Sequence, residues 1–157
     1  MLPRLRAASR VLVKNSFGRH PLISNTVSGG ALLVVGDWIQ QKCFESRRDV
    51  DWERSGRMLA VGLSQGPPHH YWYKYLDLLL PGKTVTTVAK KILADQLVAA
   101  PFFAVTFVVF AALLEGRSLE QAWSEFVAKF PTIYLFDWVI WPPSQAINFL
   151  LVPQQFR

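Results

Sequence analysis

The sequence predicts an all-α, polytopic transmembrane helical bundle with about four membrane-spanning helices, and three observations support this. Apolar residues make up 51% of the 157 residues and charged residues only 18%, against roughly 25% charged residues in an average soluble domain. Four apolar stretches follow one another, each of about twenty residues, the length that a helix needs to cross about 30 Å of hydrocarbon. Aromatic residues gather near the ends of these stretches, as they do at the headgroup level of membrane proteins.

Residues 1–20 form a basic stretch that we expect to be a mitochondrial targeting leader. The formal net charge is +6, and most of it lies in the first 36 residues, which hold five basic side chains and no carboxylate (Arg4, Arg6, Arg10, Lys14 and Arg19). An acid-free basic composition is typical of import segments; the alternative is an uncleaved arm that lies against anionic lipid. Because Lys and Arg do not spread over the rest of the chain, we expect no direct, sequence-specific nucleic-acid binding.

The four apolar stretches are residues 22–41, 58–80, 92–114 and 131–152, and they make residues 21–157 a single membrane domain. The third is the clearest, because no charge follows Asp95 until Glu115. The other three contain glycines, prolines and single carboxylates, and the second is interrupted at residues 66–70. Neighbouring helices in a bundle tolerate such breaks. A soluble helical bundle remains the alternative for these three.

The orientation of the bundle is predicted from the basic residues in its connections. With four spans, one side of the membrane receives ten Lys and Arg and the other receives seven. The ten include those of both chain ends. We therefore expect both ends on the matrix side.

Three single carboxylates lie in three different apolar stretches: Asp37, Asp95 and Asp137. A charged side chain in the bilayer costs on the order of 3 kcal/mol, so it normally faces the bundle interior, a partner or water. One interpretation is a polar path lined by these groups together with three amides (Gln96, Gln145 and Asn148). The alternative is that each carboxylate lies at the membrane surface or makes an interhelical hydrogen bond.

No enzyme motif occurs in the sequence, and we expect no catalytic, cofactor-binding or metal-binding residues. His69 and His70 are adjacent, so on a helix they point about 100° apart and do not readily hold one metal ion. Cys43 is the single cysteine, which excludes a disulfide framework within the chain.

Gly62 and Gly66 form a small-xxx-small motif, which lets helix backbones approach closely in lipid. Gly29, Gly30 and Gly36 give the first stretch a similar small face. These residues predict helix packing within a compact bundle and are compatible with a homo-oligomer.

Several short motifs in order resemble the Mpv-seventeen / twenty-two-kilodalton peroxisomal membrane protein family, in particular its Mpv-seventeen-like mitochondrial members. The similarity extends over nearly all of the chain after the leader. The earlier motifs are Asn25-Thr26…Gly30…Gly36-Asp37…Gln40, then Gly62…Gly66-Pro67…His70-Tyr71-Trp72-Tyr73, then Lys90-Lys91…Asp95-Gln96…Pro101. The most specific one is Asp137-Trp138…Trp141-Pro142…Gln145…Asn148-Phe149…Val152-Pro153…Arg157.

The resemblance implies a four-span protein without cofactor in the mitochondrial inner membrane, with the peroxisomal membrane as the alternative. It also adds Trp138 and Trp141 to the candidate site. Proposed roles in the family include a non-selective channel, mitochondrial DNA maintenance, and ribosome assembly and translation. Family members usually continue past the last motif with a further aromatic segment, which this sequence does not include.

From these observations the leading hypothesis is a non-catalytic scaffold for assembly of the mitochondrial ribosome, with the lipid bilayer and the large ribosomal subunit as partners. Its basic arm and the segment 83–91 would then meet anionic lipid or ribosomal RNA. The alternative is a channel for small solutes or cations.

Overall fold

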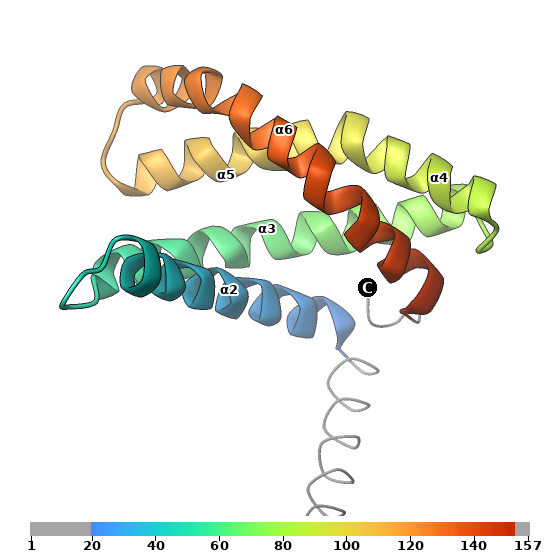
Figure 1. The fold of residues 1–157 in the computed structure, drawn as a ribbon, viewed down its shortest axis with the longest axis horizontal. Coiled ribbons are helices and arrows are strands. Elements are labelled where there is room, and N and C mark those ends of the chain that lie inside the picture. Colours follow the sequence, from blue (N-terminus) through green and yellow to red (C-terminus); the bar gives the residue numbers. More distant parts are fainter. Residues whose placement is uncertain (1–19, 153–157) are drawn as a thin grey trace, which may run out of the picture.

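The structure, a computed structural model, describes residues 20–152 (Figure 1). Within them the chain is almost entirely helical and contains no strand, so the all-α prediction is confirmed. The predicted leader lies outside the described residues except for His20, as does the end of the last motif beyond Val152. The elements are α2 (Pro21–Ile39), the π-helical turn η1 (Gln40–Phe44), α3 (Trp52–Leu79), α4 (Val85–Ala94), the π-helical turn η2 (Asp95–Ala99), α5 (Ala100–Leu114) and α6 (Leu119–Leu151).

These elements make four antiparallel rods (Figure 1). The first rod is α2 with η1, and it packs along α3. The third rod is continuous from α4 through η2 to α5, and α6 runs back along it. The start of α2, the α3–α4 connection and the end of α6 therefore lie at one end of the bundle. The α2–α3 and α5–α6 connections lie at the other end.

Two rods are long and apolar enough to cross a membrane by length and composition: Pro21–Phe44, with a mean hydropathy of 1.3, and Val85–Leu114, with a mean hydropathy of 2.6. The helices α3 and α6 have 28 and 33 residues, which at 1.5 Å per residue is also long enough to span. Their polar and charged residues lower their mean hydropathy, so composition does not mark α3 and α6 as spans. A total of four spans stays a prediction.

The distribution of side chains differs from that in a soluble domain. Many large apolar side chains are exposed on all four rods, Leu32, Leu79, Leu97 and Leu135 among them. The buried side chains include seven polar or charged ones: Asp37, Gln41, Ser55, Lys91, Asp95, Gln96 and Gln145. Lipid supplies apolar surroundings for the outer surface, whereas polar groups must find partners inside. This arrangement is that of an all-α membrane protein.

The helix α3 does not break where the sequence predicted an interruption. It continues through Pro67 and Pro68 to Leu79. Proline removes a backbone N–H donor from the helix, but neighbouring helices and side chains can satisfy the freed groups inside a bundle. Positive φ angles occur instead in the short connections, at Gly82 (102°) and Gly116 (80°), where glycine avoids the steric cost that other residues carry.

The two glycines of the small-xxx-small motif face α2. A Cβ atom at Gly62 would lie 2.6 Å from the Cα atom of Gly30, and one at Gly66 would lie 2.5 Å from the Cα atom of Thr26. No side chain can be added at either position without moving the backbone of α2. The absence of a side chain thus sets the distance between α2 and α3.

Candidate functional site

A cavity of about 610 Å³ lies among α2, α3, α5 and α6. Its apolar wall includes Leu32, Leu33, Phe103 and Phe107. Its polar wall comes from α2, α3, η2 and α6: Asn25, Gln65, His69, His70, Tyr73, Asp95, Tyr134, Asp137 and Trp141. Among the described residues that line the cavity there is no Lys or Arg.

Asp95 is the centre of the polar wall, and its carboxylate is 1% exposed. Its Oδ1 atom accepts from the Nε1 atom of Trp72 at 2.9 Å. Its Oδ2 atom accepts from Nε1 of Trp141 at 2.6 Å and from Nε2 of Gln145 at 2.9 Å. Three N–H donors satisfy the oxygens of this carboxylate and compensate its burial. Because the donors lie on α3 and α6, this residue also ties η2 to both helices.

The amides beyond Asp95 extend the same network. Gln145 also donates to the hydroxyl of Tyr73, and its Oε1 atom accepts from Nδ2 of Asn148 at 2.9 Å. The structure therefore brings together four of the residues singled out in the sequence: Asp95, Trp141, Gln145 and Asn148. Trp72 and Tyr73 complete the network; in the sequence they belong to the second motif of the family resemblance but were not candidate site residues.

Gln96 and Asp137 form a second polar pair beside this network. Gln96 is 0% exposed, its side chain lies next to the carboxylate of Asp137, and the hydroxyl of Tyr134 donates to its backbone carbonyl at 3.0 Å. Within the described residues, neither polar atom of the Gln96 carboxamide nor the Oδ2 atom of Asp137 has a partner at hydrogen-bond geometry. Asp137 lines the cavity, so it is the carboxylate there with spare capacity to accept a hydrogen bond.

Asp95 and Gln96 are both buried, and they are the first two residues of the π-helical turn η2. In a regular α-helix, consecutive side chains diverge by about 100°, whereas a π-helical turn holds an extra residue and changes the facing of its neighbours. Such turns occur often at functional sites. The sequence does not signal this geometry.

The adjacent histidines, His69 and His70, both line the cavity. The ring of His69 stacks on that of Phe103, with centroids 3.5 Å apart, and its Nδ1 atom lies 2.9 Å from the carbonyl of Gln65. A carbonyl only accepts, so Nδ1 of His69 donates. Nδ1 of His70 lies 3.4 Å from the side-chain nitrogen of Asn25 on α2.

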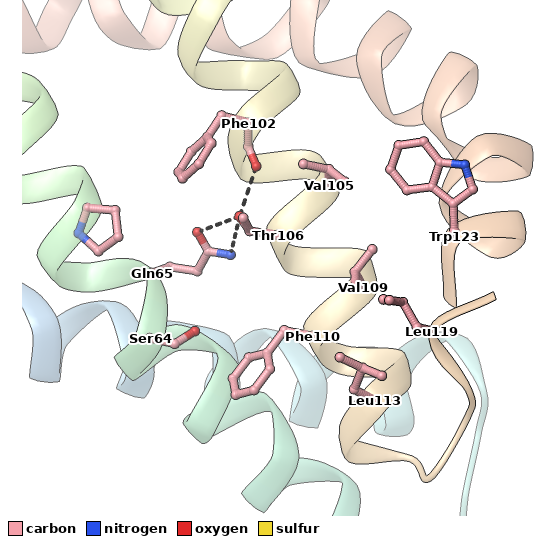
Figure 2. A pocket seen from close by; sticks show the side chains of 11 residues that line it. Ser64, Gln65, Phe102, Val105, Thr106, Val109, Phe110, Leu113, Leu119 and Trp123 are labelled. Atoms are coloured by element: carbon pink, nitrogen blue, oxygen red, sulfur yellow. Dashed lines mark hydrogen bonds between the residues drawn. The ribbon is translucent and has the colours of Figure 1, made fainter. Parts of the chain in front are cut away.

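A second hollow, of about 520 Å³, lies on the outer side of α3, α5 and the start of α6 (Figure 2). Apart from Ser64, Gln65 and Thr106 its wall is apolar, with Phe110, Leu113, Leu119 and Trp123 among its residues. Nε2 of Gln65 donates to Oγ1 of Thr106 at 3.0 Å. Gln65 lines both hollows, so its hydrogen bond to Thr106 lies between the central cavity and this second hollow.

Asp37 is not part of the cavity. It is buried at the α2–α3 connection, where its Oδ1 atom pairs with Nε of Arg54 at 2.7 Å. Its Oδ2 atom accepts from Ser55 at 2.7 Å and Gln41 at 2.8 Å. Arg54 also pairs with Glu45 at 2.8 Å, and its hydrogen bond holds the pKa of the Glu45 carboxyl below its ordinary value. The carboxylate of Asp37 therefore joins α2 to α3 and does not line the cavity.

The remaining candidate, Trp138, lies on the outer side of α6. It is partly exposed and contacts Tyr134 edge-to-face, with ring centroids 6.1 Å apart. The described residues contain no group of three His, Cys, Asp or Glu side chains that could hold a metal ion.

Fold and site together define a class: an all-α membrane protein with a polar cavity inside its bundle. Comparisons with known proteins give the family. The profile of the Mpv17 / PMP22 family matches residues 112–157. The mitochondrial inner membrane protein Mpv17 of Mus musculus is 34% identical over 148 residues, which covers 92% of this chain and 84% of the relative. The chain belongs to the Mpv17 / PMP22 family.

Two further relatives show how broad this similarity is. The mitochondrial inner membrane protein Mpv17 of Xenopus laevis is 34% identical over 155 residues, covering 97% of this chain and 85% of the relative. PXMP2/4 family protein 2 of Dictyostelium discoideum is 32% identical over 145 residues, covering 88% and 75%. No solved structure matches. The predicted family and the predicted mitochondrial inner-membrane location are confirmed.

Proposed function

We propose that this protein is non-catalytic and provides a path for small polar solutes across the mitochondrial inner membrane, through the central cavity. The observation that supports this is the polar wall of a cavity of about 610 Å³ inside a bundle whose outer surface is apolar. Polar groups within a membrane bundle are expensive and are normally turned toward partners, water or a substrate path. The cavity volume lies in the range of about 300–1,000 Å³ typical of small-molecule sites.

The charges of the wall favour cations and neutral solutes over anions. Asp95 and Asp137 are the carboxylates of the wall, and the described lining residues include no cationic side chain of Lys or Arg. The carboxylate of Asp95 already accepts three hydrogen bonds. Asp137 is therefore the group available to a passing solute, and it is the residue on which ion selectivity should depend.

The purified full chain in planar lipid bilayers tests this proposal. We expect single-channel conductance with a preference for cations, and we expect Asp137→Asn to reduce that preference. Asp49→Asn is the matched control, because it removes the same charge from an exposed connection outside the cavity. Bilayers that stay silent with folded protein would contradict the path, and equal selectivity of wild type and Asp137→Asn would contradict the role of Asp137.

The role in ribosome assembly that the resemblance implies stays a prediction. It is tested by sedimentation of mitochondrial lysate through a sucrose gradient. Co-migration with the large ribosomal subunit, and loss of that subunit after depletion of the protein, are the results it requires. Self-association stays a prediction as well.

A further inference from the structure

The two ends of the bundle differ in how their basic side chains are paired. At the end that holds the α2–α3 and α5–α6 connections, most basic side chains contact carboxylates. Arg47 pairs with Glu45 at 2.9 Å, and Arg57 pairs with Glu53 at 2.8 Å. The other pairs at this end are Arg54 with Asp37 and Glu45, Arg117 with Glu115 and Glu125, and Lys129 with Glu125. The positive charge of this end is thus largely compensated within the protein.

At the opposite end, the α3–α4 corner, residues 74–90, carries positive charge that no described carboxylate compensates. Lys74, Lys83 and Lys90 are exposed, and none of them has an ion pair or hydrogen bond with another described residue. The sequence contains no carboxylate between Asp77 and Asp95. Three ammonium groups without a partner among the described residues therefore lie in this turn and in the two helices that it joins.

Lys91, the fourth lysine of this region, is used internally. It is 2% exposed, pairs with Asp77 on α3, and lies 5.1 Å from the ring centroid of Phe149 on α6. The sequence analysis grouped this lysine with the rest of segment 83–91 as one basic surface. In the structure Lys91 is not part of that surface, because it contacts α3 and α6. Lys83 and Lys90 of the segment are exposed and available to a partner.

Large apolar side chains flank the same turn. Leu79 is 76% exposed and Val85 is 82% exposed, and Lys83 lies between them in the sequence. Apolar side chains beside free ammonium groups fit the boundary between acyl chains and headgroups, where lysine stems lie along lipid and their charges reach the phosphates. Bound RNA would pair with the lysines but would leave Leu79 and Val85 in water.

We infer that the α3–α4 corner binds the headgroups of anionic phospholipids, with Lys74, Lys83 and Lys90 as phosphate contacts and Leu79 and Val85 inserted into the acyl region. This surface is separate from the central cavity and does not depend on its proposed function.

The test measures binding of cardiolipin and of phosphatidylcholine to the purified full chain in mixed micelles, by native mass spectrometry. The triple variant Lys74→Gln/Lys83→Gln/Lys90→Gln removes the three free charges. Basic residues near a lipid surface each strengthen binding severalfold, so we expect the affinity for cardiolipin to fall at least about tenfold. The affinity for phosphatidylcholine should stay unchanged.

The matched control is Arg47→Gln/Arg48→Gln/Lys129→Gln, which removes the same net charge from the opposite end and should leave the affinity for cardiolipin near that of wild type. An unchanged affinity in the corner variant, or an equal loss in both variants, would overturn the inference. So would an RNA that the corner binds more tightly than cardiolipin at equal phosphate concentration. If the triple variant does not fold, the affinity of the single variant Lys83→Gln for cardiolipin is measured instead, and it should also be lower than that of wild type.

Discussion

Asp95 has an environment that only a carboxylate satisfies. Each of its two oxygens faces at least one N–H donor, from Trp72 on one side and from Trp141 and Gln145 on the other. An asparagine of the same shape offers one acceptor oxygen and one NH₂ group, and the NH₂ group would face a donor in either orientation. The two acceptor oxygens of Asp95 are therefore needed for packing, independently of any path through the cavity.

Asp95→Asn should accordingly destabilise the bundle. Hydrogen bonds to charged groups contribute about 1.5–3 kcal/mol each, and an unpaired buried donor adds a penalty, so we expect a loss of about 2–4 kcal/mol. Thermal unfolding in detergent, followed by tryptophan fluorescence, measures the change. Asp49→Asn, in an exposed connection, should unfold at the wild-type temperature. If the two variants unfolded together, the network around Asp95 would not contribute to stability.

At the scale of the elements, the contact between α2 and α3 depends on two glycines. The backbones of the two helices approach so closely at Gly62 and Gly66 that a Cβ atom at either would lie within 2.6 Å of a Cα atom of α2. Close backbone approach increases van der Waals contact, which is a main source of helix association in lipid. The buried carboxylate of Asp37 then fixes the register of the same pair at its far end.

Alanine at either glycine should push α2 and α3 apart. We expect Gly62→Ala and Gly66→Ala each to lower the free energy of unfolding by about 1–3 kcal/mol, as overpacking of a tight contact does. Gly56→Ala is a control within the same helix, because a Cβ atom there would meet nothing within 4 Å. That variant should be neutral or more stable by about 0.5–1 kcal/mol. Chemical denaturation in micelles distinguishes the three, and equal stability of all of them would contradict this account of the packing.

At the scale of the whole molecule, the number of basic residues on each side predicts how the bundle lies in the membrane: ten Lys and Arg fall on the side of both chain ends and seven on the other. The free lysines of the α3–α4 corner share their end with the start of α2 and the end of α6. Loops on the cytoplasmic side of membrane proteins carry an excess of Lys and Arg, and the matrix is the corresponding side of the inner membrane. The connections at the other end, with their paired charges, should then face the intermembrane space.

Cys43 is a native reporter for this orientation, because it is the single cysteine of the chain and is exposed near the α2–α3 connection. In mitochondria with a ruptured outer membrane, a maleimide that cannot cross membranes should modify Cys43 while the inner membrane is intact. Cys43→Ser is the control for the specificity of the reaction. Modification only after the inner membrane is opened would place this connection in the matrix and reverse the predicted topology.

Much of the molecule follows from the sequence because the signals are local. Runs of apolar residues predict the helices, and the spacing of Gly62 and Gly66 indicates a close helix contact. The sequence also singled out Asp95, Trp141, Gln145 and Asn148, which meet in one network. It did not indicate that His69 and His70 line a cavity, because their position depends on a helix that continues through two prolines.

By itself, then, the sequence determined an apolar helical bundle of the Mpv17 / PMP22 family in the mitochondrial inner membrane. Only the tertiary structure decided which polar residues act together: Asp95 and Asp137 line the cavity, whereas Asp37 pairs with Arg54 at the α2–α3 connection. The physical reason is that a buried polar group requires a partner, and partners 18 to 72 residues apart are chosen by helix packing and by the π-helical turn at Asp95. Neither leaves a local pattern in the chain.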